Sequence, residues 1–151
     1  MKITLLYSEL LLDITNKNRS EVALLEPSAR YRAEIGTDKE EEVQRCLLGS
    51  LSTLTANYMR FMRESSIVSD TDSPDIPSSI EIDLVGSDRR FGGKKSAIVS
   101  CMHSLLVNMT LSQFYLSVGH PELSKMRSDL ALSEVQVLKK LLYTKQPPCL
   151  C

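Results

Sequence analysis

The chain has 151 residues, of which 42% are hydrophobic and 25% are charged, and its formal net charge is −1. This length favours a single domain over two independent cores. Only 5% of the residues are aromatic and tryptophan is absent, so the core must consist mainly of Leu, Ile, Val and Met, which is typical of helix packing. The near-neutral charge excludes a global field that would attract nucleic acid or an anionic membrane.

The sequence has no recognisable targeting signal and no disulfide spacing, which favours a location in a cytoplasm, or in a particle assembled there. No apolar run approaches the roughly 18 residues of a membrane span. The apolar stretch near the N-terminus is interrupted by Ser8 and Glu9, which makes it a poor signal peptide. The four cysteines do not have the spacing of a disulfide framework, which favours a reducing compartment.

The first 36 residues predict a bent region of short helices. Residues 3–14 are rich in Leu and Ile, and Asn16 and Asn18 predict a turn after them. A second short helical segment is expected over 21–25, stopped by a proline, and a third over 28–35, ended by a glycine.

The clearest predicted element is a long helix over residues 37–63. Three glutamates crowd its first turns, where the helix dipole favours carboxylates. Apolar residues then recur every three or four positions, which places them on one stripe. They are Val43, Leu47, Leu51, Leu54, Tyr58 and Phe61.

A polar connection and one short strand are expected next. Residues 64–79 are rich in Ser, Asp and Pro, and we predict a long loop there. Ile80, Ile82 and Leu84 then alternate with polar positions, the period of a strand over 80–85. Because a lone strand cannot satisfy its backbone groups, we expect these three residues to bind a neighbouring segment or chain.

Two long helices complete the predicted fold. The first is expected over about 96–118 and the second over about 121–143, joined by Gly119 and a short link, which predicts an antiparallel hairpin. Pro147-Pro148 ends the pattern, so residues 144–151 are expected to form a tail. The predicted architecture is mainly α: one helical bundle over 1–151 with a long central helix, this hairpin and one short β segment.

The motifs for nucleotide and metal chemistry are incomplete. The segment 91–96 (Phe-Gly-Gly-Lys-Lys-Ser) resembles a phosphate-binding loop, but Asp88 stands where a glycine is needed. A metal site would have to combine Cys101, His103 and His120 with the cysteines at 149 and 151, which lack a second ligand pair at zinc spacing. No nucleophile–base signature is present. We therefore expect no enzyme, no cofactor and no metal.

The one basic cluster comprises Arg89, Arg90, Lys94 and Lys95. It could bind nucleic-acid phosphates, although only Phe91 accompanies it as a stacking aromatic. A solvated turn, or a contact with an acidic neighbour such as the run 40–42, is the preferred interpretation, and the four residues are candidates for partner binding. Direct contact with nucleic acid stays the weaker alternative.

The C-terminal half resembles a known family in its order of elements. A short strand, a basic turn, a long helix and a last helix that begins with Pro121-Glu122 follow one another over residues 80–148. This order is similar to that of small head–tail connector (neck or adaptor) proteins of tailed phages and prophages, particularly those of Bacteroidetes. The chain departs from that pattern where a Trp would be expected near the end of the first hairpin helix and Phe114-Tyr115 stand instead.

The resemblance implies a non-enzymatic structural subunit of a homo-oligomeric ring between the portal and the tail. Its expected partners are other copies of itself and the portal and tail or neck proteins, without a membrane. Its expected location is the head–tail junction of a virion assembled in the bacterial cytoplasm. The alternative function is that of a small helical regulatory or nucleic-acid-binding protein that uses the basic cluster.

Overall fold

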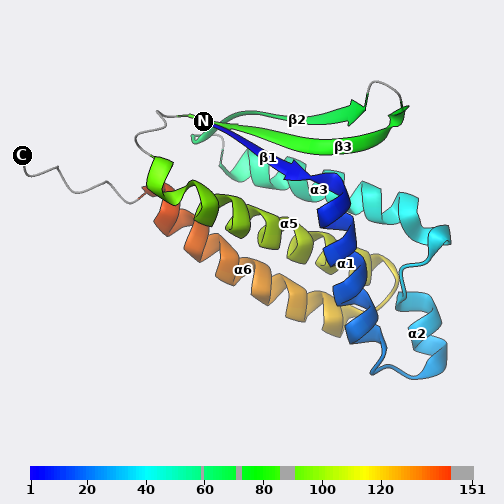
Figure 1. Cartoon of the computed structure of the whole chain (residues 1–151). Helices are drawn as coiled ribbons and strands as arrows, with labels where there is room; N and C mark the ends of the chain where they lie inside the picture. Colours follow the sequence, from blue (N-terminus) through cyan, green and yellow to red (C-terminus); the bar gives the residue numbers. More distant parts are fainter. Residues whose placement is uncertain (59, 71–72, 86–90, 144–151) are drawn as a thin grey trace, which may run out of the picture.

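The computed structural model describes residues 1–58, 60–70, 73–85 and 91–143. In chain order these residues form β1 (Lys2–Leu6), α1 (Tyr7–Val22), α2 (Pro27–Ala33), the 3₁₀ turn η1 (Thr37–Lys39), α3 (Glu40–Asn57), β2 (Met62–Asp70), β3 (Ser73–Leu84), the 3₁₀ turn η2 (Gly92–Lys94), α5 (Lys95–Ser117) and α6 (Pro121–Tyr143). The mainly α prediction is confirmed, with a small antiparallel sheet added to the helices (Figure 1).

Helix α5 lies at the centre of the fold. It contacts α6, α3, α1 and β1. Its apolar side chains are buried on nearly every side, because each neighbour covers a different face of the helix; Leu105, Leu106, Val107 and Leu111 are all fully buried. The core therefore lies between α5 and the inner face of the sheet, with α1 and α3 closing it (Figure 1).

The C-terminal helical hairpin follows the prediction closely. Helices α5 and α6 are antiparallel and are separated only by residues 118–120. Gly119 has a φ of +81°, the left-handed conformation in which helices commonly end. The amide of Gly119 donates to the carbonyl of Leu116, and the amide of His120 donates to that of Tyr115, so the last carbonyls of α5 are satisfied by the turn.

The three strands form one antiparallel sheet in the order β1-β3-β2. Ile82 pairs with Ile3 of β1 on one side and with Ser65 of β2 on the other. Alternate side chains of a strand point to the same face of the sheet, and Ile3, Leu5, Ile80 and Ile82 point toward the helices and are buried. The opposite face carries polar side chains such as Lys2 and Glu81, which form an ion pair.

The predicted polar loop over 64–79 is wrong. Residues 62–70 and 73–84 pair as a hairpin, with register irregularities near Ser69. Ser, Asp and Pro are poor strand formers, but β3 has hydrogen-bonding partners on both sides, and such pairing overrides weak local preference. Pro77 lies at one of these irregularities, where the ladder tolerates a residue without an amide hydrogen.

The N-terminal region also differs from the expectation. Residues 2–6 form an edge strand, and α1 continues without a break to Val22 through the predicted turn at Asn16 and Asn18. Asn18 does not end the helix because its side chain is fully buried and bonded to distant backbone groups. Pro27 starts α2 as its first residue, a position where the missing amide hydrogen carries no penalty.

Helix α3 is shorter than the predicted 37–63 helix, yet its stripe is confirmed. The helix ends at Asn57, and Tyr58 and Phe61 belong to the turn that leads into β2. All six predicted stripe residues are buried. The ring of Phe61 lies edge-on to Tyr143 with centroids 4.7 Å apart, which ties this turn to the end of α6.

Candidate functional site

The predicted partner-binding strand residues lie inside the protein's own core. Ile80, Ile82 and Leu84 are at most 1% exposed. They belong to β3, the central strand, whose two edges are paired with β1 and β2. The expectation that this strand pairs with another chain is therefore wrong for these residues, because neither their side chains nor their backbone groups are accessible.

The structure places only part of the predicted basic cluster. Arg89 and Arg90 lie outside the described residues, and so does the predicted tail over 144–151. Lys94 ends η2, and Lys95 is the exposed first residue of α5. Whether the four residues form one surface stays a prediction.

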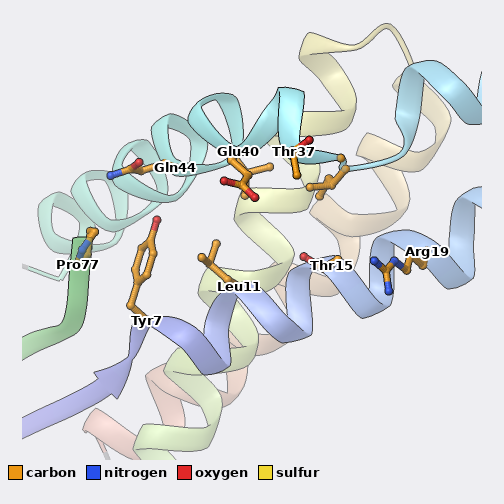
Figure 2. A pocket seen from close by; sticks show the side chains of 11 residues that line it. Tyr7, Leu11, Thr15, Arg19, Thr37, Glu40, Gln44 and Pro77 are labelled. Atoms are coloured by element: carbon orange, nitrogen blue, oxygen red, sulfur yellow. The ribbon is translucent and has the colours of Figure 1, made fainter. Parts of the chain in front are cut away.

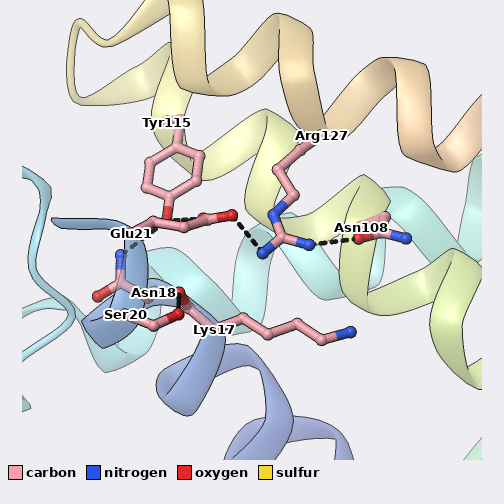
Figure 3. Close-up of polar contacts among 7 residues, drawn as sticks. All are labelled: Lys17, Asn18, Ser20, Glu21, Asn108, Tyr115 and Arg127. Carbon is pink, nitrogen blue, oxygen red and sulfur yellow. Dashed lines mark hydrogen bonds and ion pairs between the residues drawn. The ribbon is translucent and has the colours of Figure 1, made fainter. Parts of the chain in front are cut away.

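A buried polar cluster joins α1, α5 and α6 (Figure 3). The Arg127 guanidinium of α6 forms an ion pair with Glu21 of α1, and its Nη1 donates to Asn108 Oδ1 of α5 at 2.8 Å. Tyr115 of α5 donates its hydroxyl to the other carboxylate oxygen of Glu21 at 2.6 Å. Burial and then the nearby Glu21 carboxylate raise the pKa of Tyr115, so the phenol stays protonated and acts as a donor.

Asn18 extends this cluster to the segment after α1. Its Nδ2 donates to the carbonyl of Ala33 at 2.8 Å and to the hydroxyl of Tyr115 at 3.3 Å, and its Oδ1 accepts from the amide of Ile35 at 2.8 Å. One side-chain amide thereby satisfies two backbone groups, one in the last residue of α2 and one just after it. These contacts hold α1, α5, α6 and the end of α2 in position relative to one another.

Two other polar pairs lie on α5. His103 Nε2 is 2.8 Å from Asp13 Oδ2 of α1. Cys101 Sγ donates to the backbone carbonyl and the carboxylate of Glu134 at 3.3 and 3.4 Å. Burial, and next the hydrogen bond to Glu134, raise the pKa of this thiol to about 12, which leaves it protonated and unreactive at neutral pH.

An open groove runs between α1 and α3 (Figure 2). Its volume is about 590 Å³. One wall is a ladder of α1 residues spaced four apart: Tyr7, Leu11, Thr15 and Arg19. Glu40 and Gln44 of α3 lie on the opposite wall. Burial, and next the negative charge of Glu40, raise the pKa of the Tyr7 hydroxyl.

Helix α6 presents an apolar stripe that the described part of the fold covers only in part. We call the α6 stripe the five residues Leu123, Met126, Leu130, Val137 and Leu141, which recur at spacings of 3, 4, 7 and 4. Met126, Leu130 and Val137 are 40%, 45% and 47% exposed, and the other two are partly buried. The helix instead turns Ser124, Arg127, Ala131, Leu138 and Leu142 toward α5.

Within residues 1–58, 60–70, 73–85 and 91–143 no group of three His, Cys, Asp or Glu side chains could hold a metal ion. Helix α5 is long and apolar enough to cross a membrane, but 56% of its most apolar window is buried inside the fold. Its position at the centre of the core accounts for that composition.

The spacing of the α6 residues places the stripe on one face of the helix, but it does not show whether that face is buried. Sequence reasoning missed the groove, because Tyr7 to Arg19 seemed to belong to two different elements. The signal that was present is the four-residue spacing of the ladder, which continues across Asn16. No protein-family model matches the chain, and no curated protein or solved structure matches it significantly.

Proposed function

We propose that this protein is a non-enzymatic structural subunit that forms a homo-oligomeric ring at the head–tail junction of a tailed phage or prophage. The observation that carries the proposal is the α6 stripe. Single exposed apolar residues are normal on a protein surface, whereas several gathered along one helix face mark an interaction site. Covering Met126, Leu130 and Val137 would remove nearly half of each side chain's surface from water.

The arrangement of the C-terminal half is compatible with this proposal. Strand β3 is followed by α5 and then, after three residues, by α6, the order of elements on which the resemblance to connector proteins rests. Pairing of β3 inside the chain removes strand addition at residues 80–84 as a route to assembly. The proposal therefore rests on side-chain surfaces, and α6 carries more exposed large hydrophobic residues than any other described helix.

The first test is the mass of the purified protein in solution, measured by light scattering over a concentration series. A ring, or a monomer that assembles when a portal protein is added, supports the proposal. A monomer or dimer that ignores a portal protein contradicts it. If that species binds DNA with a steep salt dependence that is lost on changing Arg89, Arg90, Lys94 and Lys95, the regulatory alternative replaces the proposal.

A matched pair of variants tests whether the α6 stripe carries assembly. Leu130→Gln makes the stripe polar, and Leu132→Gln makes the same change on an equally apolar residue that is 59% exposed. The two positions lie about 200° apart around the helix. We expect Leu130→Gln to weaken assembly and Leu132→Gln to leave it unchanged. Equal effects would contradict a role for the stripe.

A further inference from the structure

Strand β2 forms one edge of the sheet, and the pairing of β3 fixes the direction of its backbone groups (Figure 1). Leu84 of β3 exchanges two backbone hydrogen bonds with Met1, on the β1 side. Val85, the next residue, donates its amide to the carbonyl of Phe61, on the β2 side. Successive residues of a strand direct their backbone groups to opposite sides, so the even-numbered residues of β3 bond to β1 and the odd-numbered ones bond to β2.

Two residues of β2 therefore direct their backbone groups away from the sheet. Ser65 and Ile67 pair with Ile82 and Ile80, the even-numbered residues of β3 whose backbone groups bond to β1. The amides and carbonyls of Ser65 and Ile67 accordingly face the open edge. Within residues 1–58, 60–70, 73–85 and 91–143 no strand pairs with that edge.

The middle of β2 lacks the residues that usually block the addition of a strand. Residues 65–69 (Ser-Ser-Ile-Val-Ser) include no charged residue and no proline. The register irregularities lie toward the two ends of β2, and the pairing is regular from residue 64 to residue 68. Because an open edge is a template for another chain, natural edge strands are commonly protected by lysine, proline or a bulge. The regular part of β2 has no such protection.

A groove beside this edge has room for the side chains of an added strand. Its volume is about 450 Å³. Leu48, Ser52 and Thr55 of α3 line one wall, and Ser65 and Ile67 of β2 line the other. All the lining residues belong to α3 or β2, so the groove opens on the side of β2 away from β3. None of them is charged, which favours an uncharged occupant.

The two ends of this groove differ in chemistry. Thr55 Oγ1 lies 2.9 Å from Ser65 Oγ, so one end presents hydroxyl groups. The chain reverses between α3 and β2, and the rise of about 6 Å from Thr55 back to Leu51 matches the step of about 6.6 Å from Ser65 to Ile67. Ile67 therefore lies beside Leu51, with the 43% exposed Leu48 beyond it. The second end is apolar.

We propose that β2 binds an extended segment of a different protein chain as a fourth strand of the sheet. The segment has an apolar side chain opposite Ile67 and a small or hydroxyl-bearing side chain opposite Ser65. Antiparallel pairing continues the sheet, so the small residue follows the apolar one by two positions. In this mode of recognition main-chain hydrogen bonds give affinity and pockets for alternate side chains give specificity. The surface is separate from the α6 stripe, and the inference goes beyond the proposed function.

A second copy of β2 fits this edge less well. The antiparallel register with full overlap is centred on Ser66, and it places the hydroxyl of Ser65 opposite Ile67 at the apolar end. The register that matches the groove is centred on Ile67. It places the acidic residues at positions 64 and 70 opposite each other at both ends of the pair. Like charges directly opposite destabilise a strand pair, so the segment comes from a different chain.

A synthetic peptide with this pattern, acetyl-Thr-Lys-Leu-Thr-Ser-Lys-Thr-amide, tests the inference on the full chain. Its leucine lies opposite Ile67 and its serine opposite Ser65. At saturation we expect hydrogen exchange at the Ser65 and Ile67 amides, followed by NMR, to slow on the order of tenfold. Exchange at the Ser66 amide should not change, because that residue already bonds to β3.

Two methylated peptides separate backbone pairing from contact with the groove alone. Methylation of the backbone nitrogens of the leucine and the serine removes the two donors that face β2. We expect it to weaken binding at least about tenfold in a fluorescence anisotropy titration. Methylation of the central threonine nitrogen, which points away from β2, should leave the affinity unchanged.

A matched pair of protein variants tests the groove. Ser52→Trp fills it and should weaken peptide binding by about tenfold. Thr53→Trp adds the same ring at an exposed residue of α3 that does not line the groove, and it should bind as the unchanged protein does. If Ser52→Trp does not fold, as judged by circular dichroism, Leu48→Asp replaces it.

Three results would overturn the inference. In the first, the peptide neither binds nor slows exchange at Ser65 and Ile67 at concentrations up to about 1 mM. In the second, the two methylated peptides bind equally, which assigns any binding to side chains alone. In the third, the Ser65 and Ile67 amides are already protected in the protein without peptide, which assigns the edge to this chain or to a second copy of it.

Discussion

Arg127 of α6 and Glu21 of α1 form an ion pair whose side chains are only 8% and 14% exposed. The two helices do not pack extensively on each other, since α6 packs mainly on α5. The pair therefore links the outer helix of the C-terminal hairpin to the N-terminal helix around α5 (Figure 3). Through Arg127 the pair also helps to position α6, which carries the stripe that we propose for assembly.

Removing one partner of this pair should cost substantial stability. Arg127→Met leaves the Glu21 carboxylate buried without its counter-charge, and we expect the free energy of unfolding in urea to fall by about 3–5 kcal/mol. The double variant Arg127→Met with Glu21→Leu should lose less than Arg127→Met alone, because neither charge remains buried. A double variant that loses as much as the sum of the two single changes would show that the residues act independently.

Asn18→Ala should loosen the segment that follows α2. The change removes the acceptor for the Ile35 amide and the donor to the Ala33 carbonyl, both in buried positions. We expect a loss of about 1–3 kcal/mol in unfolding free energy and faster hydrogen exchange at the Ile35 amide. Asn16→Ala, at an exposed position of the same helix, is the control and should change neither quantity. Unchanged exchange at Ile35 in Asn18→Ala would contradict the bond.

Gly119→Ala tests the turn between α5 and α6. Gly119 is in the left-handed region at φ +81°, and an added Cβ is strained there even though no atom lies within 4 Å of it. The expected loss is about 1–2 kcal/mol in unfolding free energy. Gly93→Ala, where an added Cβ also meets nothing within 4 Å and φ is not positive, should be nearly neutral. Equal losses in the two variants would refute the conformational explanation.

Cys101 should make the protein less stable in alkaline solution. Its pKa is raised from 9.0 to about 12 by burial and by the hydrogen bond to Glu134, so between these values the unfolded chain has lost the thiol proton that the folded chain keeps. The stabilisation is present below pH 9 and is lost as the pH rises toward 12, at no more than about 1.4 kcal/mol per pH unit. Urea titrations between pH 8 and about 11 should show a shallower decline for Cys101→Ala than for the unchanged protein. Identical slopes would contradict the shift.

The sequence by itself determined the helical hairpin and the stripe of α3. Residues 96–118 and 121–143 differ by at most one residue from α5 and α6, because Gly119 and Pro121 are local signals that act whatever the rest of the chain does. The apolar spacing from Val43 to Phe61 likewise identified a face that is buried in the structure. Both features depend on interactions between residues close in sequence.

Only the tertiary structure decided the sheet, the length of α1 and the two open surfaces. Residues 62–70 and 73–84 form strands because β3 finds backbone partners in β1, from the other end of the chain, and in β2, which no local pattern reveals. Helix α1 continues through Asn18 because Ala33 and Ile35 satisfy that side chain. The α6 stripe is exposed because, among the described elements, α6 packs mainly on α5, whereas α5 is also covered by α3, α1 and β1. Periodicity shows which residues share a face, but which face is buried depends on what the distant parts of the chain place against it.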